Sequence, residues 1–413
     1  MARDSAGEPK AWRRTTYVVA ATELFVLAGF GLALPFLPLY IQQLGVTDAP
    51  SVAWWTGVMS AASGFTMAAA TPIWGAVGDR FGWKPMLVRA IVGGGLVLVA
   101  MGLVGSVGQL LALRFLQGAF SGTVAAAATL VATIAPREET GYAVGVVSAS
   151  IQVGNFVGPL LGGITLVTLG FRGSFGLSGV VLLCCAVAAS VWVSEAPASR
   201  ATATVQRASL RAALAPIGAA FAAFGWPQLR GVVLAQFATQ LTFSATLALF
   251  PLYAQTITRP PWLSIELAIG AAFAATALSS AAATPLLGRL ADRRGARRVL
   301  AFGALVAGAV LVLHAVEPNA LVVVLLRLVL GVGVAAVTAA TVVLTRRAAH
   351  EGAEGRAFGA SLGAQTLGWG TGPLLGAAIV AGAGLTWLFV AAGALTIALA
   401  PATLLGRKWF PVK

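Results

Sequence analysis

Long apolar runs, separated by short charged segments, constrain the fold of this chain more than any other feature. Of its 413 residues, 58% are hydrophobic and 10% are charged, whereas about a quarter of the residues of a soluble protein carry charge. Lipid must therefore be the solvent for much of the surface. A membrane-spanning helix needs about 20 apolar residues, so twelve such helices would use about 240 and leave room for short loops and one longer link.

The apolar runs predict two sets of six transmembrane helices. The spans are 17–40, 52–77, 86–104, 107–132, 142–169 and 174–193, then 230–255, 263–287, 299–316, 320–345, 356–381 and 385–405. The alanine-rich segment 205–224 is expected to lie as a helix on the inner membrane surface. We therefore expect an all-α membrane protein, with an N-terminal bundle (1–194), a cytoplasmic linker (195–228) and a C-terminal bundle (229–413).

The distribution of lysine and arginine predicts the orientation. If the N-terminus is cytoplasmic, the outer loops contain only Arg172 and Arg259, and nearly all other basic residues outside the spans lie on the inner side. This is the bias of the positive-inside rule. It predicts that both termini are cytoplasmic and that the chain crosses the bacterial inner (plasma) membrane an even number of times. The first apolar run, 17–40, is too long for the core of a signal peptide and is expected to be retained.

An internal repeat relates the two sets of spans. Pro38-Leu39-Tyr40 recurs 213 residues later as Pro251-Leu252-Tyr253, the GAVGDRFG segment that begins at Gly75 recurs at the same offset as GRLADRRG, and Gly158-Pro159 recurs at an offset of 214 as Gly372-Pro373. Arg114 and Arg327 are also 213 residues apart. Duplicated halves related by an axis along the membrane normal are one established plan for secondary transporters, with the substrate path between the halves. The repeat therefore predicts two similar bundles with pseudo-twofold symmetry.

The duplicated segment between the second and third span of each half is a candidate gating loop. Its glycines permit tight turns, and an aspartate near the N-terminus of a neighbouring helix gains about 0.3–1 kcal/mol, which suits a latch that forms in one state only. The alternative is an ordinary basic inner loop, against which the second copy argues. The candidate residues are Gly75, Asp79, Arg80, Gly82, Lys84, Gly288, Asp292, Arg293, Gly295 and Arg297.

These paired loops resemble the signature loop of the major facilitator superfamily. The Arg114-x-x-Gln117-Gly118 segment is similar to a pattern of its proton-coupled members, and Gly154-x-x-x-Gly158-Pro159-x-x-Gly162-Gly163 matches its antiporter signature. The resemblance covers nearly the whole chain and is closest to the bacterial branch of twelve-helix drug:proton antiporters. It implies the major facilitator fold, a role of Arg114 in proton coupling, and an export function.

Span five also has a purely physical interpretation. Gly154 and Gly158 form a face of small residues that lets helices pack closely, and Pro159 removes a backbone donor and bends the helix. The alternative to the antiporter interpretation is therefore a helix bend that serves packing only and says nothing about the direction of transport.

Glu23 is the only acidic residue well inside a span, where a charge costs about 2.5–3.5 kcal/mol or more. Proton antiport needs a group that is charged in one state and neutral in another, and a carboxyl in an apolar site meets that requirement. The stripe formed by Glu23, Leu27 and Phe30 is expected to face a cavity, whereas snorkelling to the inner headgroups is the alternative. Glu23 and Arg114 differ in height by about 15 Å, so no direct ion pair is expected; Arg114 could instead satisfy a buried amide or carbonyl.

The resemblance implies that spans one, four, seven and ten, with parts of five and eleven, line the substrate cavity, so their amide and aromatic residues are candidates for it, although each could be an ordinary packing residue. Ligand cavities are mostly apolar with few polar groups, and the set is Phe30, Gln117, Gln152, Asn155, Gln236, Gln240, Phe243, Gln365 and Trp369. A lone His314 at the outer end of span nine is interpreted as incidental. The adjacent Cys184 and Cys185 do not make a disulfide framework, and no metal site, cofactor or nucleic-acid surface is expected.

The sequence thus predicts a proton-coupled exporter of small amphipathic or hydrophobic compounds, acting as a monomer by alternating access. An exporter of sugars or metabolites, or an uptake symporter, would keep the fold, but its cavity would be expected to hold more polar groups. A membrane sensor would be expected to carry a larger soluble part. An enzyme is not expected, since no nucleophile triad, metal cluster or phosphate loop is found.

Overall fold

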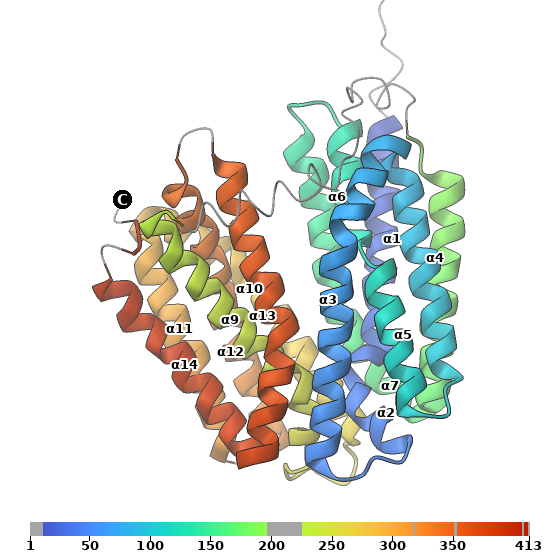
Figure 1. Ribbon diagram of the computed structural model, residues 1–413, viewed down its shortest axis with the longest axis vertical. Helices are drawn as coiled ribbons and strands as arrows, with labels where there is room; N and C mark the ends of the chain where they lie inside the picture. The colour runs from blue at the N-terminus through green and yellow to red at the C-terminus, as the bar shows by residue number, and fades with distance from the viewer. Residues whose placement is uncertain (1–10, 196–224, 317–318, 351–352, 407–408, 412–413) are drawn as a thin grey trace, which may run out of the picture. The chain divides into compact units, whose positions relative to one another are not determined.

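The computed structural model describes residues 11–195, 225–316, 319–350, 353–406 and 409–411 (Figure 1). Within these ranges, all regular secondary structure is helical, which agrees with the predicted all-α class. The predicted surface helix at 205–224 and most of the predicted linker lie outside the described residues. In chain order the helices are α1 (Ala11–Ala33), η1 (Leu34–Phe36), α2 (Leu37–Gln43), α3 (Ala49–Phe81), α4 (Trp83–Gly102), α5 (Val107–Phe120), α6 (Thr123–Ile134), α7 (Thr140–Trp192), α9 (Pro227–Ala254), α10 (Ile265–Arg294), α11 (Ala296–Leu313), η3 (His314–Val316), α12 (Ala320–Ala348), α13 (Glu354–Ala383) and α14 (Leu385–Leu405).

Every predicted span coincides with helix in the structure. Among the described residues, nine helical stretches are long and apolar enough to cross a membrane. One of these is α7, with 53 residues, which contains two of the predicted spans because the backbone turns at Gly170 (φ 66°). Helices α3 and α13 cover two further predicted spans and are not among the nine. The total of twelve spans stays a prediction.

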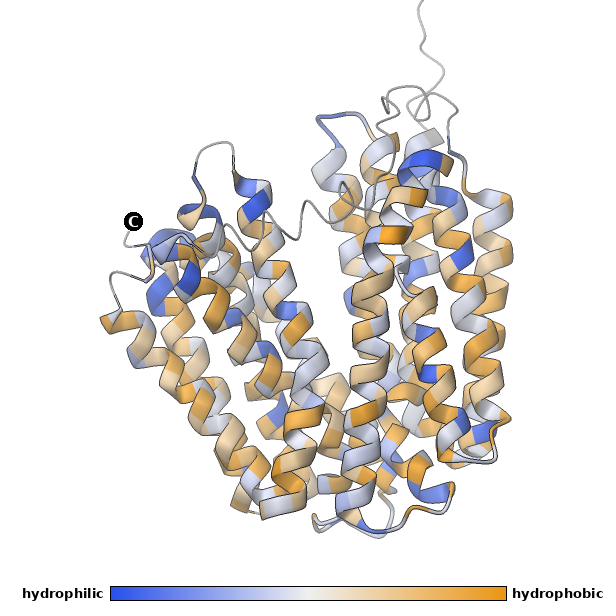
Figure 2. Ribbon diagram, viewed as in Figure 1, coloured by the Kyte–Doolittle hydropathy of each residue, from blue (hydrophilic) through white to orange (hydrophobic). Residues whose placement is uncertain are grey.

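The described residues divide into two compact units. One holds those within 1–34, 66–104 and 112–209, and the other those within 35–65, 105–111 and 210–413. In both units the middle of each helix is mainly hydrophobic and the hydrophilic residues gather near the helix ends (Figure 2). A few hydrophilic positions interrupt the apolar middle of the helices (Figure 2).

The predicted fourth span, 107–132, is interrupted in the structure. It forms α5 and α6, joined by Ser121 and by Gly122, whose φ of 115° favours glycine. The break exposes backbone carbonyls that an unbroken helix would satisfy. The indole Nε1 of Trp74 donates to the carbonyl of Ala119 at 2.7 Å, and Nη2 of Arg89 donates to that of Ser121 at 3.2 Å. Side chains from α3 and α4 therefore stabilise a break that the apolar pattern did not predict.

The predicted gating loops are much shorter than expected. Helix α3 continues to Phe81 and α10 to Arg294, so the turns consist of Gly82 (φ 99°) and Gly295 (φ 102°). The interpretation of the whole segment as a loop is therefore wrong. Gly75, Asp79 and Arg80 lie in the last turns of α3, and Gly288, Asp292 and Arg293 in those of α10, because the glycines at the start of each segment are compatible with helix and only the last one takes a positive φ.

Candidate coupling and transport site

Glu23 lies in the middle of α1 and is completely buried, with 0% of its surface exposed. Neither carboxyl oxygen has a hydrogen-bond partner among the described residues. The snorkelling alternative is therefore wrong in this conformation, because a snorkelling carboxyl would reach the surface. The burial also means that the carboxyl is not open to a water-filled cavity here. An ionised carboxylate in such a place carries a desolvation cost of several kcal/mol.

The N-terminal end of α6 lies close to this carboxyl group. The side chain of Thr123, the first residue of α6, is next to the Glu23 carboxyl, although no hydrogen bond within normal limits joins them. The positive end of a helix dipole favours a nearby negative charge by about 0.3–1 kcal/mol, and by up to about 2 kcal/mol in partly buried geometries. The interruption between α5 and α6 thus places a helix start beside Glu23, which offers its charged form partial compensation.

The antiporter-signature glycines hold α7 tightly against α1 at the level of Glu23. A Cβ atom on Gly154 would lie 2.5 Å from the carbonyl oxygen of Leu24, the residue after Glu23, and one on Gly158 would lie 2.8 Å from that of Ala28. Pro159, Gly162 and Gly163 are buried in the same helix. The close-packing interpretation is therefore confirmed for Gly154 and Gly158, and the motif also defines the surroundings of the buried acid.

Arg114 lies on α5, where its Nη1 donates a hydrogen bond to Oε1 of Gln117, one turn further along. Its Nε has no partner among the described residues. The single ion pair between described residues joins Arg13 and Glu139, so Glu23 and Arg114 do not pair, as the difference in height predicted. The arginine–glutamine part of the motif is thus a local unit on one helix face.

The position equivalent to Glu23 in the second half has a different environment. Gln236, 213 residues later in α9, is buried, and its Nε2 donates to the hydroxyl of Thr345 at 3.5 Å, while its Oε1 accepts from Nε2 of Gln365 at 3.4 Å. The hydroxyls of Thr345 and Ser361 are 3.0 Å apart and extend this network. A polar group at this position in the second half is therefore satisfied by its neighbours.

The second buried arginine is packed among aromatic rings. Arg327 in α12 is 1% exposed, and its guanidinium carbon lies 3.8 Å from the ring centroid of Phe250. His314 is completely buried beside it and stacks on Phe389 at 5.3 Å and 9°, while its Nδ1 donates to the carbonyl of Val310 at 2.8 Å. The sequence carried no sign of this environment, because the rings around His314 come from α9 and α14. In the first half the Gln117 amide contacts the arginine. Its equivalent in the second half is Leu330, which cannot accept a hydrogen bond, and the face of the Phe250 ring contacts Arg327 instead.

The sequence analysis did not identify Glu195, whose carboxylate caps α4. Oε1 of Glu195 accepts a hydrogen bond from the backbone N–H of Trp83 at 2.8 Å, and Oε2 accepts one from that of Lys84 at 3.1 Å. Glutamate at a helix N-terminus satisfies free N–H donors and complements the helix dipole. The candidate residues Asp79 and Asp292 are exposed on α3 and α10, so the helix N-terminus in this part of the unit is occupied by Glu195 instead of Asp79.

In the second half, a base instead of an acid joins the helices that correspond to α4 and α7, namely α11 and α14. Arg297, 213 residues after Lys84, donates from Nε and Nη2 to the carbonyl of Thr403 at 2.8 and 2.6 Å, and from Nη2 to that of Leu404 at 2.6 Å. These carbonyls lie in the last turn of α14, where a cation is favoured. Both signature turns are therefore fixed to the end of the last helix of their own half, by an acid in one half and by a base in the other.

The structure brings some of the predicted cavity residues together. Gln236 contacts Gln365 as described, and the rings of Phe243 and Trp369 lie 6.3 Å apart. Phe30 packs against α4 at Gly94, where an added Cβ would lie 3.0 Å from its ring. Gln152 and Asn155 are exposed on α7, Gln117 is held by Arg114, and Gln240 is partly buried on α9. No group of three or more potential metal ligands occurs among the described residues.

Comparison with known proteins supplies a family. The profile of the Major Facilitator Superfamily matches residues 19–266 and 232–413. The chain is 31% identical over 385 residues to the Multidrug resistance protein MdtG of Proteus mirabilis, a match that covers 92% of this chain and 92% of that protein. It is also 31% identical over 386 residues to MdtG of Dickeya zeae, covering 92% of this chain and 91% of that protein.

Solved structures show the same fold at low sequence identity. A crystal structure of a mutant of the nucleoside transporter NupG matches with a TM-score of 0.76 at 13% identity, covering 95% of this chain and 100% of that chain. A bacterial homolog to the human lysosomal transporter Spinster matches with a TM-score of 0.76 at 16% identity, covering 98% of each chain. These similarities agree with the predicted fold class.

Proposed function

Because this chain belongs to the Major Facilitator Superfamily of membrane transporters, we propose that it exports small amphipathic or hydrophobic compounds in exchange for protons, with Glu23 as the proton carrier. The similarity to Multidrug resistance protein MdtG over 92% of the chain supports export of drug-like compounds. The antiporter signature on α7 supports the direction of transport. The buried carboxyl of Glu23 supports coupling to protons.

The observation that carries this proposal is the lack of hydrogen-bond partners around Glu23. Both of its carboxyl oxygens are buried and unpartnered. A structural acid is normally hydrogen-bonded or paired when it is buried. An acid that is retained without such partners meets the requirement of a group that changes its protonation state during a cycle. In the conformation of this structure we assign Glu23 the neutral form, because the ionised form has no partner to offset its desolvation.

Arg114 and the α6 N-terminus are proposed to stabilise the charged form in another state of the cycle. Both lie in the same unit as Glu23, and both carry a full or partial positive charge. Movement of α1 relative to α5 and α6 would change the electrostatic environment of the carboxyl without a direct ion pair. Glu23 would thus release its proton when substrate binds and take it up again when the cavity is empty.

The proposed substrate cavity is apolar with a few amides and aromatic rings. Phe243 and Trp369 form a tilted aromatic pair, and the Trp369 side chain is 40% exposed. Aromatic faces bind flat hydrophobic molecules and also attract cationic groups through cation–π contacts worth about 0.5–2 kcal/mol. Amides such as Gln240 add single polar contacts, a composition typical of sites that accept varied drug-like ligands.

Transport by alternating access requires that the two halves move as near-rigid bodies about this cavity. We propose that the helix ends at Asp79 and Asp292 contribute to closing the cytoplasmic side. The fixed attachments of Glu195 to α4 and of Arg297 to α14 support this, because each joins two helices of one half at the end that carries the signature turn.

The experiment that tests the proposal is transport of a lipophilic cationic dye in proteoliposomes with an imposed pH gradient. The wild type should move the dye against its gradient when the proton gradient has the correct sign, and the Glu23→Gln variant should not. Without a pH gradient, Glu23→Gln should still exchange labelled for unlabelled dye, which shows that the variant is folded and binds substrate. The Glu354→Gln variant, which removes an exposed acid from the first turn of α13, is the matched control and should retain gradient-driven transport.

Two results would overturn the proposal. Wild-type protein that moves no lipophilic compound under any pH gradient would remove the function of drug:proton exchange. A Glu23→Gln variant that concentrates the dye as well as the wild type would remove Glu23 from the coupling mechanism and leave the export function intact.

A further inference from the structure

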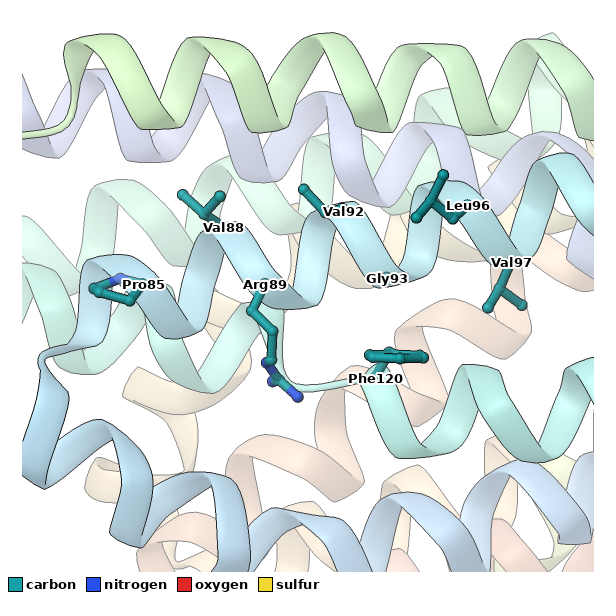
Figure 3. A pocket seen from close by; sticks show the side chains of 8 residues that line it. All are labelled: Pro85, Val88, Arg89, Val92, Gly93, Leu96, Val97 and Phe120. Atoms are coloured by element: carbon teal, nitrogen blue, oxygen red, sulfur yellow. The ribbon is translucent and has the colours of Figure 1, made fainter.

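A cavity of about 480 Å³ lies between α4 and the break that separates α5 from α6, and neither Glu23 nor any of the proposed substrate residues lines it (Figure 3). Its volume is in the range of small-molecule sites, about 300–1,000 Å³. All its residues belong to one unit. Its walls are Pro85, Val88, Arg89, Val92, Gly93, Leu96, Val97 and Phe120. Arg89 is thus the one charged residue in an otherwise apolar lining.

The guanidinium of Arg89 has donors without acceptors. Its Nη2 donates to the carbonyl of Ser121, and its guanidinium carbon lies 3.7 Å from the ring centroid of Trp74. Its Nε and Nη1 have no hydrogen-bond partner among the described residues. The described part of the chain also offers it no acid, since the single ion pair there joins Arg13 to Glu139. Charged groups at membrane depth pair with another charge or with backbone carbonyls, so the two free donors of Arg89 favour an anionic ligand from outside the chain.

The order of polar and apolar groups along α4 matches that of a phospholipid. Arg89 is six residues into the helix, about 9 Å from its start, whereas Val92 and Leu96 are about 14 and 20 Å from it. The headgroup region of a bilayer is about 5–8 Å thick on each side, so Arg89 lies near the boundary between headgroups and hydrocarbon. The valine and leucine walls extend from there toward the middle of the membrane.

The cavity is open along its length instead of being closed off. Leu96 is 55% exposed, and Pro85 at the other end is exposed as well. In the close-up, Arg89 and Phe120 point toward one another into the space between α4 and α5 (Figure 3). Gly93 lets the Phe120 ring pack closely on α4, because a Cβ there would lie 2.5 Å from that ring. A long chain could therefore lie along α4 with one end at Arg89.

We propose that this cavity binds an anionic phospholipid, with the phosphate at Arg89 and one acyl chain along Val92 and Leu96. Anionic lipids concentrate near basic residues at the cytoplasmic surface, with about 1 kcal/mol per basic residue, and basic pockets between transmembrane helices bind their headgroups. The equivalent of Arg89 in the second half, 213 residues later, is Phe302, and α12 is continuous where α5 and α6 are broken. The site therefore belongs to the first half alone.

Bound lipid would stabilise the break between α5 and α6, because the phosphate would accept from Arg89 while Arg89 remains bonded to Ser121. The test is native mass spectrometry of the full-length purified protein with phosphatidylglycerol or phosphatidylethanolamine of the same acyl chains. The wild type should retain phosphatidylglycerol in preference. Arg89→Gln should lower that retention about fivefold or more, and Arg89→Lys should largely keep it.

Two controls keep the result interpretable. Arg346→Gln removes an exposed arginine at the end of α12 and should leave retention unchanged. Val92→Phe fills the apolar wall without touching the charge, and should lower retention even if Arg89→Gln does not fold. Equal loss in Arg89→Gln and Arg346→Gln, or equal retention of the two lipids, would overturn the proposal. So would binding of soluble glycerol 3-phosphate that matches phosphatidylglycerol, since the acyl chain would then play no part.

Discussion

The helix pairs α1–α7 and α9–α13 are equivalent by the repeat, yet the central polar residue is hydrogen-bonded in one pair and has no hydrogen-bond partner in the other. In the second pair, Gln236 exchanges hydrogen bonds with Thr345 and Gln365. In the first pair, Glu23 has no such partner. The offset of 214 that pairs Gly158 with Gly372 also pairs Gln365 with Ile151 and Ser361 with Val147. The first half thus lacks the polar side chains that satisfy the second.

The comparison of Glu23 with Gln236 shows which features of this position serve packing and which do not. Both helix pairs share the close contact at their glycines, so packing does not require the acid. An unsatisfied buried carboxyl destabilises the fold, and a hydrogen-bonded amide in the same place does not. The acid is therefore retained at a cost in stability, which is the pattern expected of a functional group.

The largest expected effect comes from exchanging the two residues. The double variant Glu23→Gln/Gln236→Glu moves the carboxyl into the network of Thr345 and Gln365, where it is hydrogen-bonded. Gradient-driven dye transport in proteoliposomes should fall to the background of empty vesicles, because a satisfied acid beside the wrong helices does not respond to substrate. Transport at the wild-type rate would show that an acid in either half can carry the proton, and would contradict the claim that coupling belongs to the first half.

The glycine contacts should be the next most sensitive feature. A Cβ on Gly158 would meet only backbone and glycine atoms of α1, at Ala28 and Gly31, so Gly158→Ala should destabilise the protein by about 1–3 kcal/mol. At Gly372 an added Cβ would meet the Ser244 hydroxyl as well as the carbonyl of Leu241. Gly372→Ala should therefore cost a similar amount, of which rotation of Ser244 recovers part. Thermal unfolding in detergent measures both.

Gly145 in α7 provides the control, since an added Cβ there has no neighbour within 4 Å. Gly145→Ala should leave the unfolding temperature unchanged or raise it slightly, because alanine favours helix over glycine by up to about 1 kcal/mol. If Gly158→Ala behaves like Gly145→Ala, the close approach of α1 and α7 is not as the structure describes.

The side chains that attach the two signature turns, Glu195 in the first half and Arg297 in the second, should have smaller effects on stability that can be separated from each other. Glu195→Gln weakens the bonds to the N–H groups of Trp83 and Lys84, and Arg297→Gln removes those to the carbonyls of Thr403 and Leu404. Each should cost about 1 kcal/mol. Hydrogen exchange of the Trp83 and Lys84 amides should accelerate in Glu195→Gln and stay unchanged in Arg297→Gln; acceleration in both would mean that the two halves are not fastened independently.

The smallest effect is expected at the ion pair between Arg13 and Glu139, which lie 3.3 Å apart with side chains 54% and 41% exposed. Exposed pairs contribute about 0.2–1 kcal/mol and are screened by salt. A double-mutant cycle on the unfolding free energy should give a coupling in this range that falls at high salt. A coupling that stays constant as the salt concentration rises would show that the pair is shielded from water.

The sequence was sufficient for the helices, because they follow from local apolar runs, and for the repeat, because its motifs recur at an almost constant offset. Every predicted span coincides with helix, and Arg114 bonds its i+3 neighbour Gln117, as one turn of helix allows. The break after Phe120 was missed because Ser121 and Gly122 interrupt the apolar pattern only briefly. Its stabilisation depends on Trp74 and Arg89, which lie far away in sequence.

The contacts of the candidate site could not be predicted for the same reason. Glu195 reaches Trp83 across 112 residues, and His314 meets Phe389 through a fold that one sequence does not specify. The absence of partners around Glu23 depends on which side chains of α6 and α7 face α1. Spacing along the chain identified the acid, but only tertiary packing shows that it is unsatisfied.

The most direct test of the central claim is proton release when substrate binds to the purified protein. In weakly buffered detergent solution with a pH indicator, addition of a lipophilic cationic compound should release protons from the wild type and from the control variant Glu354→Gln. Glu23→Gln should bind the same compound, as measured by calorimetry, and release none. Equal proton release from Glu23→Gln and the wild type would contradict the assignment of Glu23 as the proton carrier.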